Sequence, residues 1–247
     1  MKVNRNAATA LLLTAWGVGT IGAFWHLEWQ YLRPVARPEG ALTAKPDTCP
    51  PPPVSVLETD RGEYDLRSPG TVTLINFWNP SCPCSRYMET HVARLAATYE
   101  KRGVRFVTVV ECGETNTERT DALKAWKDRS LDRFAVAADP GSAIARAFGV
   151  WAAPAAVILN QRGRITYVGA YNAARFCDAR RTAWAEQALA STVDNKPLLR
   201  SNSPFFGCQV LAAAPPAAPS HDLSKSKRAA FAAILSLRFH QWGGVRR

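Results

Sequence analysis

The chain has 247 residues, 47% of them hydrophobic and 10% aromatic, which is enough to build a folded core and excludes an intrinsically disordered protein. Six cysteines over this length also exclude a small fold that depends on a disulfide scaffold. The formal net charge is +11, but no nucleic-acid-binding motif accompanies it, and we therefore expect no nucleic acid as a partner.

The apolar run from Ala7 to Trp25 carries no charged residue and predicts a membrane-spanning helix within residues 1–32. Lys2 and Arg5 precede the run, as expected at a cytoplasmic end, and aromatic residues suited to a membrane interface follow it. A cleaved signal peptide fits less well, because no small-residue cleavage site follows the run. We therefore expect a single-pass anchor in the inner (cytoplasmic) membrane, with the remaining chain in the periplasm.

Residues 33–53 contain seven prolines and predict an extended linker that holds the following domain away from the bilayer. We expect a folded domain over residues 54–195 and a C-terminal extension over residues 196–247. The last part of that extension, from residue 221, carries six basic residues and one acidic residue. Such a tail suits an anionic surface, or is simply solvated.

The predicted domain alternates between strand and helix patterns. Expected strands are 54–58, 63–66, 71–78, 104–110, 134–137, 155–159 and 164–169, and expected helices are 84–101, 119–129, a short one ending at 148, and 180–192. This order predicts an α/β fold with a mixed central sheet and helices on both faces.

The most informative segment joins an apolar run, Thr73 to Trp78, to Cys82 and Cys84 at the expected start of a helix. The first N–H groups of a helix lack partners inside it, and its dipole places partial positive charge there. Both features stabilise a thiolate, which is the nucleophilic form of cysteine. We therefore expect the sulfur of Cys82 to be ionised and reachable at neutral pH.

The stretch LINFWNPSCPC resembles the thioredoxin-like, membrane-anchored reductases of the TlpA and ResA type, whose signature reads approximately L-N-F-W-x-x-W-C-x-x-C. Segments 104–114, 148–154 and 157–163 resemble further family motifs in the same order. The resemblance implies a thioredoxin-like fold and a thiol–disulfide oxidoreductase that acts on protein thiols or disulfides. It also implies a membrane or periplasmic electron donor, and neither a cofactor nor a bound metal.

The resemblance assigns the attacking role to Cys82 and places Trp78, Ala153 and Pro154 at the substrate groove, with Pro154 in cis. It makes Glu114 the proton carrier, with Glu111 as the reserve candidate. The position of the buried thioredoxin aspartate is occupied by Asn76.

The sequence departs from the family pattern at the second cysteine, because Ser85 stands where C-x-x-C would place it and Cys84 gives C-P-C instead. Two hypotheses remain open: a strained, easily reduced Cys82–Cys84 pair, or a Cys82 that a remote cysteine resolves. A Cys177–Cys208 bridge that pins the C-terminal extension is conceivable, and either of these cysteines is equally a candidate resolving thiol. Cys49 and Cys112 have no assigned role.

Two other classes of function compete with the enzyme. Two close thiolates suit Cu(I), as in a thioredoxin-fold metallochaperone, although His91 is two helical turns from Cys84 and too distant to join the same ion. A thioredoxin-like adaptor that binds without turnover is the other alternative, because a fold does not determine a function.

Overall fold

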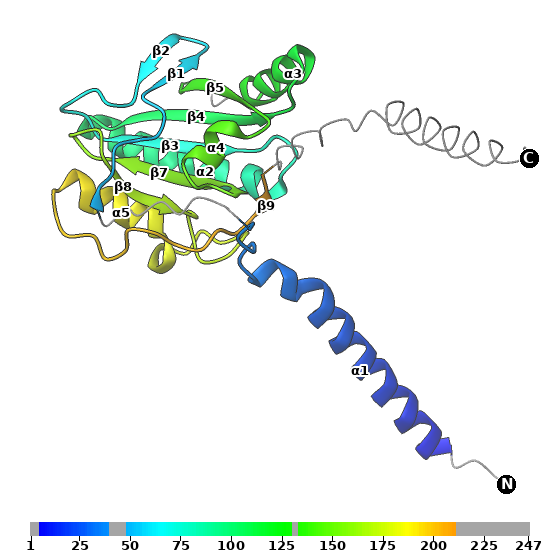
Figure 1. Ribbon diagram of the computed structural model, residues 1–247. Coiled ribbons are helices and arrows are strands. Elements are labelled where there is room, and N and C mark those ends of the chain that lie inside the picture. The colour runs from blue at the N-terminus through cyan, green and yellow to red at the C-terminus, as the bar shows by residue number, and fades with distance from the viewer. Residues whose placement is uncertain (1–4, 40–47, 130–132, 211–247) are drawn as a thin grey trace, which may run out of the picture. The chain divides into compact units, whose positions relative to one another are not determined.

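The computed structural model describes residues 5–39, 48–129 and 133–210 (Figure 1). The predicted basic tail lies outside these residues. Within them, a long N-terminal helix precedes an α/β domain that is built on one large sheet.

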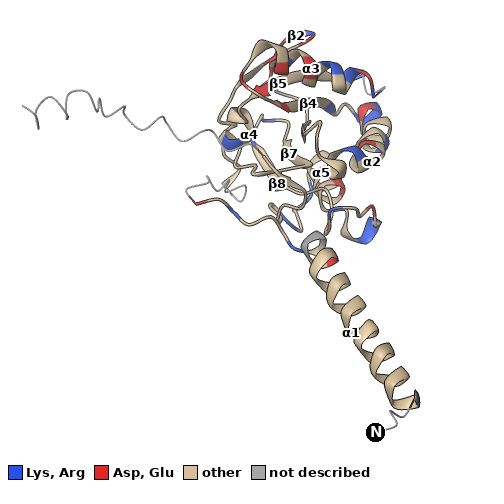
Figure 2. Cartoon of the chain, turned by 90° about the vertical axis from the view of Figure 1, so that its right-hand side faces the viewer, with Lys and Arg blue, Asp and Glu red and all other residues tan. Residues whose placement is uncertain are grey.

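Helix α1 runs from Arg5 to Leu32, and its stretch Asn6–Trp29 is long and apolar enough to cross a membrane. The large hydrophobic side chains along it are exposed, and Figure 2 shows the helix almost without charged residues. The helix continues beyond the apolar run to Leu32, within the predicted residues 1–32, because no glycine or proline follows Trp25 before Pro34.

The main sheet has seven strands: β1 Val56–Thr59, β2 Gly62–Asp65, β3 Thr73–Trp78, β4 Arg105–Cys112, β5 Ala135–Pro140, β7 Ala155–Leu159 and β8 Ile165–Gly169. Their order across the sheet is β2-β1-β5-β4-β3-β7-β8. The central strands β3, β4 and β5 are parallel, whereas the pairs at both sides are antiparallel. The predicted mixed sheet is confirmed.

The helical elements of the domain are α2 Pro83–Tyr99, η2 Glu100–Arg102, α3 Asn116–Lys127, α4 Ala143–Ala147, η3 Arg180–Thr182 and α5 Trp184–Val193. Helices α2, α3 and α5 contribute to the core on one face of the sheet, and α4 contributes to the core on the other face. Side chains of β3 alternate between these two cores, with Leu74 and Trp78 on one face and Ile75 and Phe77 on the other. Both faces are therefore covered, as the sequence predicts for a thioredoxin-like α/β fold.

Two helix starts differ from the prediction by more than two residues. Helix α3 begins at Asn116 instead of residue 119, because Thr115 and Glu118 form a capping box at its start. The helix predicted over residues 180–192 is divided at Ala183, whose backbone is not helical, into η3 and α5.

The proline-rich segment lies against the domain at both of its described ends. The amide of Val35 donates to the carbonyl of Phe205 at 2.7 Å, and the indole of Trp151 donates to the carbonyl of Val35 at 3.2 Å. At the other end, the amide of Ile165 donates to the carbonyl of Pro50 at 2.8 Å. The described ends of the predicted linker therefore contact the domain, and its role as a spacer from the bilayer stays a prediction.

Residues after α5 return to the sheet. Asn202 forms a parallel bridge with Val168 at the edge of β8, and the hydroxyl of Ser203 lies 2.8 Å from the hydroxyl of Tyr167. Phe205 and Phe206 are then buried, and the chain reaches a short strand, β9 (Cys208–Gln209). The first part of the predicted extension thus packs on the domain, and it brings Cys208 to the C-terminal end of β3.

Candidate active site

Cys82 occupies the N-cap of α2, directly after the turn that follows β3. Its carbonyl accepts the amide of Arg86, and Pro83 is the first helical residue, a position where the missing N–H costs nothing. The sulfur therefore lies beside unpaired N–H groups and the positive end of the helix dipole. This placement agrees with the electrostatic environment that the sequence predicts.

The turn before Cys82 is held by hydrogen bonds from Asn79. The side-chain oxygen of Asn79 accepts a hydrogen bond from the backbone amide of Ser81 at 2.7 Å. The backbone amide of Asn79 donates to the hydroxyl of Ser85 at 3.3 Å. Its side-chain nitrogen donates to the carboxylate of Glu111 at 2.5 Å. A buried acid on β4 thus fixes the loop that carries Cys82.

The loop opposite Cys82 contains a cis peptide bond between Ala153 and Pro154, as the family resemblance implies. The sulfur of Cys82 lies 3.4 Å from the carbonyl oxygen of Ala153. Ala152 and Ala153 form the short strand β6, which does not pair with the main sheet. The backbone edge expected to receive a substrate therefore adjoins the sulfur expected to attack it.

Cys82 is joined to Cys208 by a disulfide bond, with a Cα–Cα distance of 5.8 Å that is ordinary for such bonds. The expectation of a Cys177–Cys208 bridge is therefore wrong. Cys177 is a free thiol that lies 3.3 Å from the side-chain oxygen of Asn172. Cys84 is also free, so the structure has the remote pairing and not the Cys82–Cys84 pair.

Cys84 nevertheless lies within the same sulfur cluster. The sulfurs of Cys82, Cys84 and Cys208 are all within 4.8 Å of one another. Burial raises the pKa of the Cys84 thiol, and the positive charge of Arg175 offsets this only partly. Cys84 is thus a protonated, weakly nucleophilic thiol at neutral pH.

The expectation that Cys82 is reachable is wrong for this oxidised state, because the side chain is fully buried. The covering segment is β9, which pairs antiparallel with β6 and places Cys208 opposite Ala153. Cys208 itself is partly exposed. The short strand β9, through Cys208, therefore contributes to the burial of the sulfur.

A family model described as Domain of unknown function (DUF6436) matches residues 56–210. The chain belongs to this family. The matched region includes β9 and therefore both partners of the disulfide.

The DUF6436 chain is also similar to the thiol-disulfide oxidoreductase ResA of Halalkalibacterium halodurans, with 30% identity over 116 residues. That match covers 46% of this chain and 62% of the relative, so the chain spans less than two thirds of the relative's length. Together with the topology, this similarity confirms a thioredoxin-like protein that resembles the TlpA and ResA group.

Solved structures agree on the fold. A hypothetical protein from Sinorhizobium meliloti 1021 superposes with a TM-score of 0.58 at 18% identity, over 71% of this chain and 98% of that chain. An uncharacterized conserved protein from Geobacillus kaustophilus gives a TM-score of 0.57 at 21% identity, over 68% and 92% of the two chains.

The acidic residue that contacts the active-site turn is Glu111, and not Glu114, the expected proton carrier. Glu114 is exposed beyond the end of β4, where its carboxylate approaches Gly141. Glu111 is buried and accepts hydrogen bonds from Asn79 and from the hydroxyl of Ser142 at 3.0 Å. Because β4 extends two residues beyond its predicted end, Glu111 and not Glu114 supports the active-site turn.

Trp78 and Asn76 lie below the site and not on its surface. The indole of Trp78 is buried, donates to Glu89 at 3.2 Å and packs edge-on against Trp126. The side chain of Asn76 accepts from the hydroxyl of Tyr171 at 2.9 Å and donates to Thr108. Both residues therefore bear on the site through packing and hydrogen bonding beneath the Cys82 turn.

Sequence reasoning leaves Cys208 as one of two candidate resolving thiols and does not single it out as the partner of Cys82. The sequence offers one signal, a glycine directly before the cysteine and two aromatic anchors before the glycine. That signal is typical of a segment that approaches another backbone closely.

Proposed function

We propose that this chain is a membrane-tethered thiol–disulfide oxidoreductase that acts on protein thiols or disulfides outside the cytoplasm. The observation that carries the proposal is the position of Cys82, at the N-cap of α2 and 3.4 Å from the carbonyl oxygen of Ala153. A sulfur at a helix N-terminus and a backbone edge that accepts an added strand are thereby placed together, and in the oxidised chain β9 occupies that edge.

The proposed reaction begins from the reduced chain. The helix N-terminus stabilises the Cys82 thiolate, which attacks a disulfide of the substrate protein and forms a mixed disulfide. The substrate segment pairs with β6 at Ala152 and Ala153 as an added strand, so its main chain supplies affinity without a requirement for one sequence. A second thiol of the chain then attacks Cys82 and releases the substrate.

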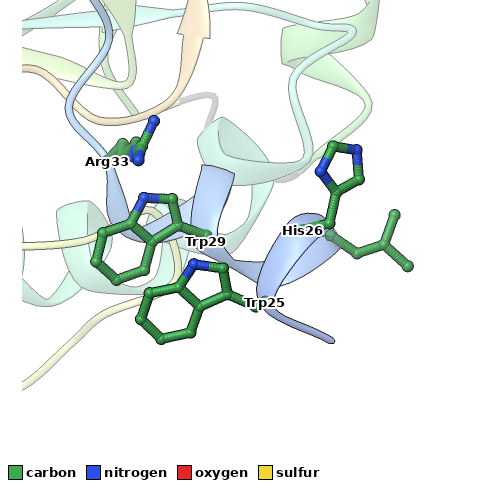
Figure 3. A pocket seen from close by; sticks show the side chains of 5 residues that line it. Trp25, His26, Trp29 and Arg33 are labelled. Carbon is green, nitrogen blue, oxygen red and sulfur yellow. The ribbon is translucent and has the colours of Figure 1, made fainter. Parts of the chain in front are cut away.

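Tethering by α1 is supported by the length and apolar character of Asn6–Trp29. At the C-terminal end of the helix, the rings of Trp25 and Trp29 stack at 4.4 Å, and the guanidinium of Arg33 lies 5.1 Å from the Trp29 ring (Figure 3). Aromatic and basic side chains of this kind anchor helices at the membrane–water interface. In a bacterial expression host, protease added to spheroplasts should digest the domain, and protection of the domain would contradict the proposed orientation.

The activity is tested with the reduced full chain in detergent micelles and a peptide disulfide that releases a chromophoric thiol. Wild type should release the chromophore and pass through a peptide adduct on Cys82, which rapid acid quenching and mass mapping would capture. Cys82→Ser should lose both signals, whereas Cys177→Ser should keep them, because Cys177 is a free cysteine outside the cluster of three sulfurs. A reduced wild-type chain that releases no chromophore would refute the proposed function.

A second candidate function is Cu(I) binding, favoured by the three sulfurs that lie within 4.8 Å of one another. Thiolates suit Cu(I), but the Cys82–Cys208 bond must first be reduced, because a disulfide supplies no thiolate. His91 is not part of this sulfur group. Titration of the reduced chain against a chromophoric Cu(I) chelator tests this candidate: one tightly bound ion that is lost in Cys84→Ser supports it, and no binding removes it.

A further inference from the structure

The backbone edge beside Cys82 is already occupied by a strand of the same chain. In the β6–β9 pair, Ala153 lies opposite Cys208 and Ala152 lies opposite Gln209. The amide of Val210 extends the ladder by donating to the carbonyl of Trp151 at 3.1 Å. This arrangement is the one expected of a bound substrate strand that is disulfide-linked to Cys82.

The close approach of this strand depends on Gly207. Its φ of 146° is a conformation that other residues rarely adopt, and a Cβ atom there would collide with the carbonyl oxygen of Ala153. The atoms that it would meet first belong to the backbone, so no flexible group could move aside. Glycine at position 207 therefore allows this strand to dock against the cis-Pro154 loop.

Anchors before the glycine hold the segment in register. The ring of Phe205 is buried with its centroid 4.3 Å from that of Trp151, and the hydroxyl of Ser203 accepts the amide of Ala170 at 2.9 Å. The strand can leave Cys82 while these anchors stay in place, so Cys208 remains tethered close to the site.

We infer that Cys208 is the resolving cysteine of this protein, and that residues 207–210 bind in the substrate groove as a built-in competitor of the substrate strand. This inference rests on the proposed function and names the second thiol of that reaction. Substrate and resolving strand use the same edge of β6, so the return of β9 both breaks the mixed disulfide and displaces the product.

The resolving step is a thiol–disulfide exchange at the sulfur of Cys82. The Cys208 thiolate attacks the sulfur of Cys82 in the mixed disulfide, the Cys82–Cys208 bond forms, and the substrate sulfur leaves as a thiolate that takes a proton from water. The substrate disulfide has then gained two electrons, and the two cysteines have lost them. A protein dithiol resets the chain in two exchanges. Its first thiolate attacks the sulfur of Cys208, a partly exposed residue, and Cys82 leaves as a thiolate. The second thiol of the donor then displaces Cys208 as a thiolate and closes the donor's own disulfide.

Cys84 is poorly suited to the same role. It is buried, and it is separated from Cys82 by a single residue, so a bond between them would need unfavourable torsions. Its thiol also stays protonated at neutral pH, because burial disfavours the thiolate.

The test compares release of the trapped peptide from the reduced full chain in micelles for Cys208→Ser, Cys84→Ser and the control Cys177→Ser. A tethered thiol has an effective concentration in the mM range, so with external thiol held near 10 µM, Cys208→Ser should slow release by about 100-fold. Cys84→Ser and Cys177→Ser should still release the peptide. Retention of the adduct in Cys84→Ser, with normal release from Cys208→Ser, would overturn the inference.

Gly207→Ala tests the competitor role without removing a thiol. The added Cβ should undock β9, speed the first attack of Cys82 on the peptide and slow resolution. Gly70→Ala is the matched control, since Gly70 also has a positive φ but has open space around its missing Cβ. Equal effects of the two changes would contradict strand competition.

Mapping of wild-type chain after turnover provides a measurement that does not depend on any variant. A peptide that links Cys82 to Cys208 supports the inference, and a Cys82–Cys84 peptide overturns it. A reduced chain that releases no chromophore and forms neither of these links would instead be a failure of the proposed function itself.

Discussion

Reduction of the Cys82–Cys208 bond should destabilise the domain far more than reduction of a Cys82–Cys84 bond could. The two linked residues are 126 positions apart. In the chain-entropy model, a loop of that length lowers the entropy of the unfolded chain enough to contribute about 5 kcal/mol at 25 °C. The loop between Cys82 and Cys84 would contribute only about 1.5 kcal/mol in the same model.

The assay is thermal unfolding of the full chain in micelles, followed by near-ultraviolet circular dichroism with and without a reductant. Natural disulfides usually contribute about 2–5 kcal/mol, and each kcal/mol shifts the Tm of a domain of this size by about 2–4 °C. We therefore expect reductant to lower the Tm by about 5–20 °C. Cys208→Ser should unfold at the reduced-state temperature under both conditions.

Cys177→Ser is the matched control, because Cys177 is a free cysteine in the same domain. It should keep the full dependence on reductant. If Cys208→Ser keeps that dependence while Cys84→Ser loses it, the Cys82–Cys208 pairing and the resolving role of Cys208 are both refuted.

Three further predictions concern the groups that hold the site together. Phe205→Ala should cost about 3 kcal/mol in urea unfolding, because a buried ring against Trp151 is lost, whereas the exposed Leu199→Ala should cost almost nothing. Burial raises the pKa of Asp139 to about 6, so the folded chain holds a proton that the unfolded chain has lost. The free energy of unfolding should then fall by up to about 3 kcal/mol as pH rises from about 4 to 6, and it should level off above pH 6. Urea titrations at each pH measure this slope, which Asp139→Asn should lack. Glu111→Gln should lower the free energy of unfolding by about 1–3 kcal/mol and slow alkylation of reduced Cys82, because the Asn79 turn loses a buried acceptor. Unchanged alkylation would show that Glu111 does not position the turn.

The main sheet could be predicted because its strands carry strong local signals. Strand β3 is a continuous apolar run whose alternate side chains serve two cores, and β7 has the bounds that the sequence predicts. Strands β6 and β9 could not be predicted, since each has only two residues and no pattern of that length has a detectable period.

The candidate site was only partly predictable for a related reason. The position of Cys82 follows from local sequence, because a strand, a turn and a helix start are encoded by neighbouring residues. Its partner depends on how residues 201–210 return along β8 to the cis-Pro154 loop, which is a tertiary arrangement. The family resemblance places Glu111 behind Glu114 as a candidate, and no local pattern shows that β4 continues for two further residues and buries Glu111.

Exposing the buried sulfur of Cys82 requires a smaller opening of the domain than exposing a sulfur in the hydrophobic core. A core sulfur becomes accessible only when the whole domain unfolds, whereas this one is covered by a short ladder from β9 and Val210 to Trp151, Ala152 and Ala153. Local opening of so few hydrogen bonds costs much less than global unfolding. Once the disulfide is reduced, hydrogen exchange at the amides of Cys208 and Val210 should therefore become faster than exchange in β3. Equal protection of these amides and of β3 would mean that Cys82 is reached only by unfolding, and no catalytic role could then be sustained.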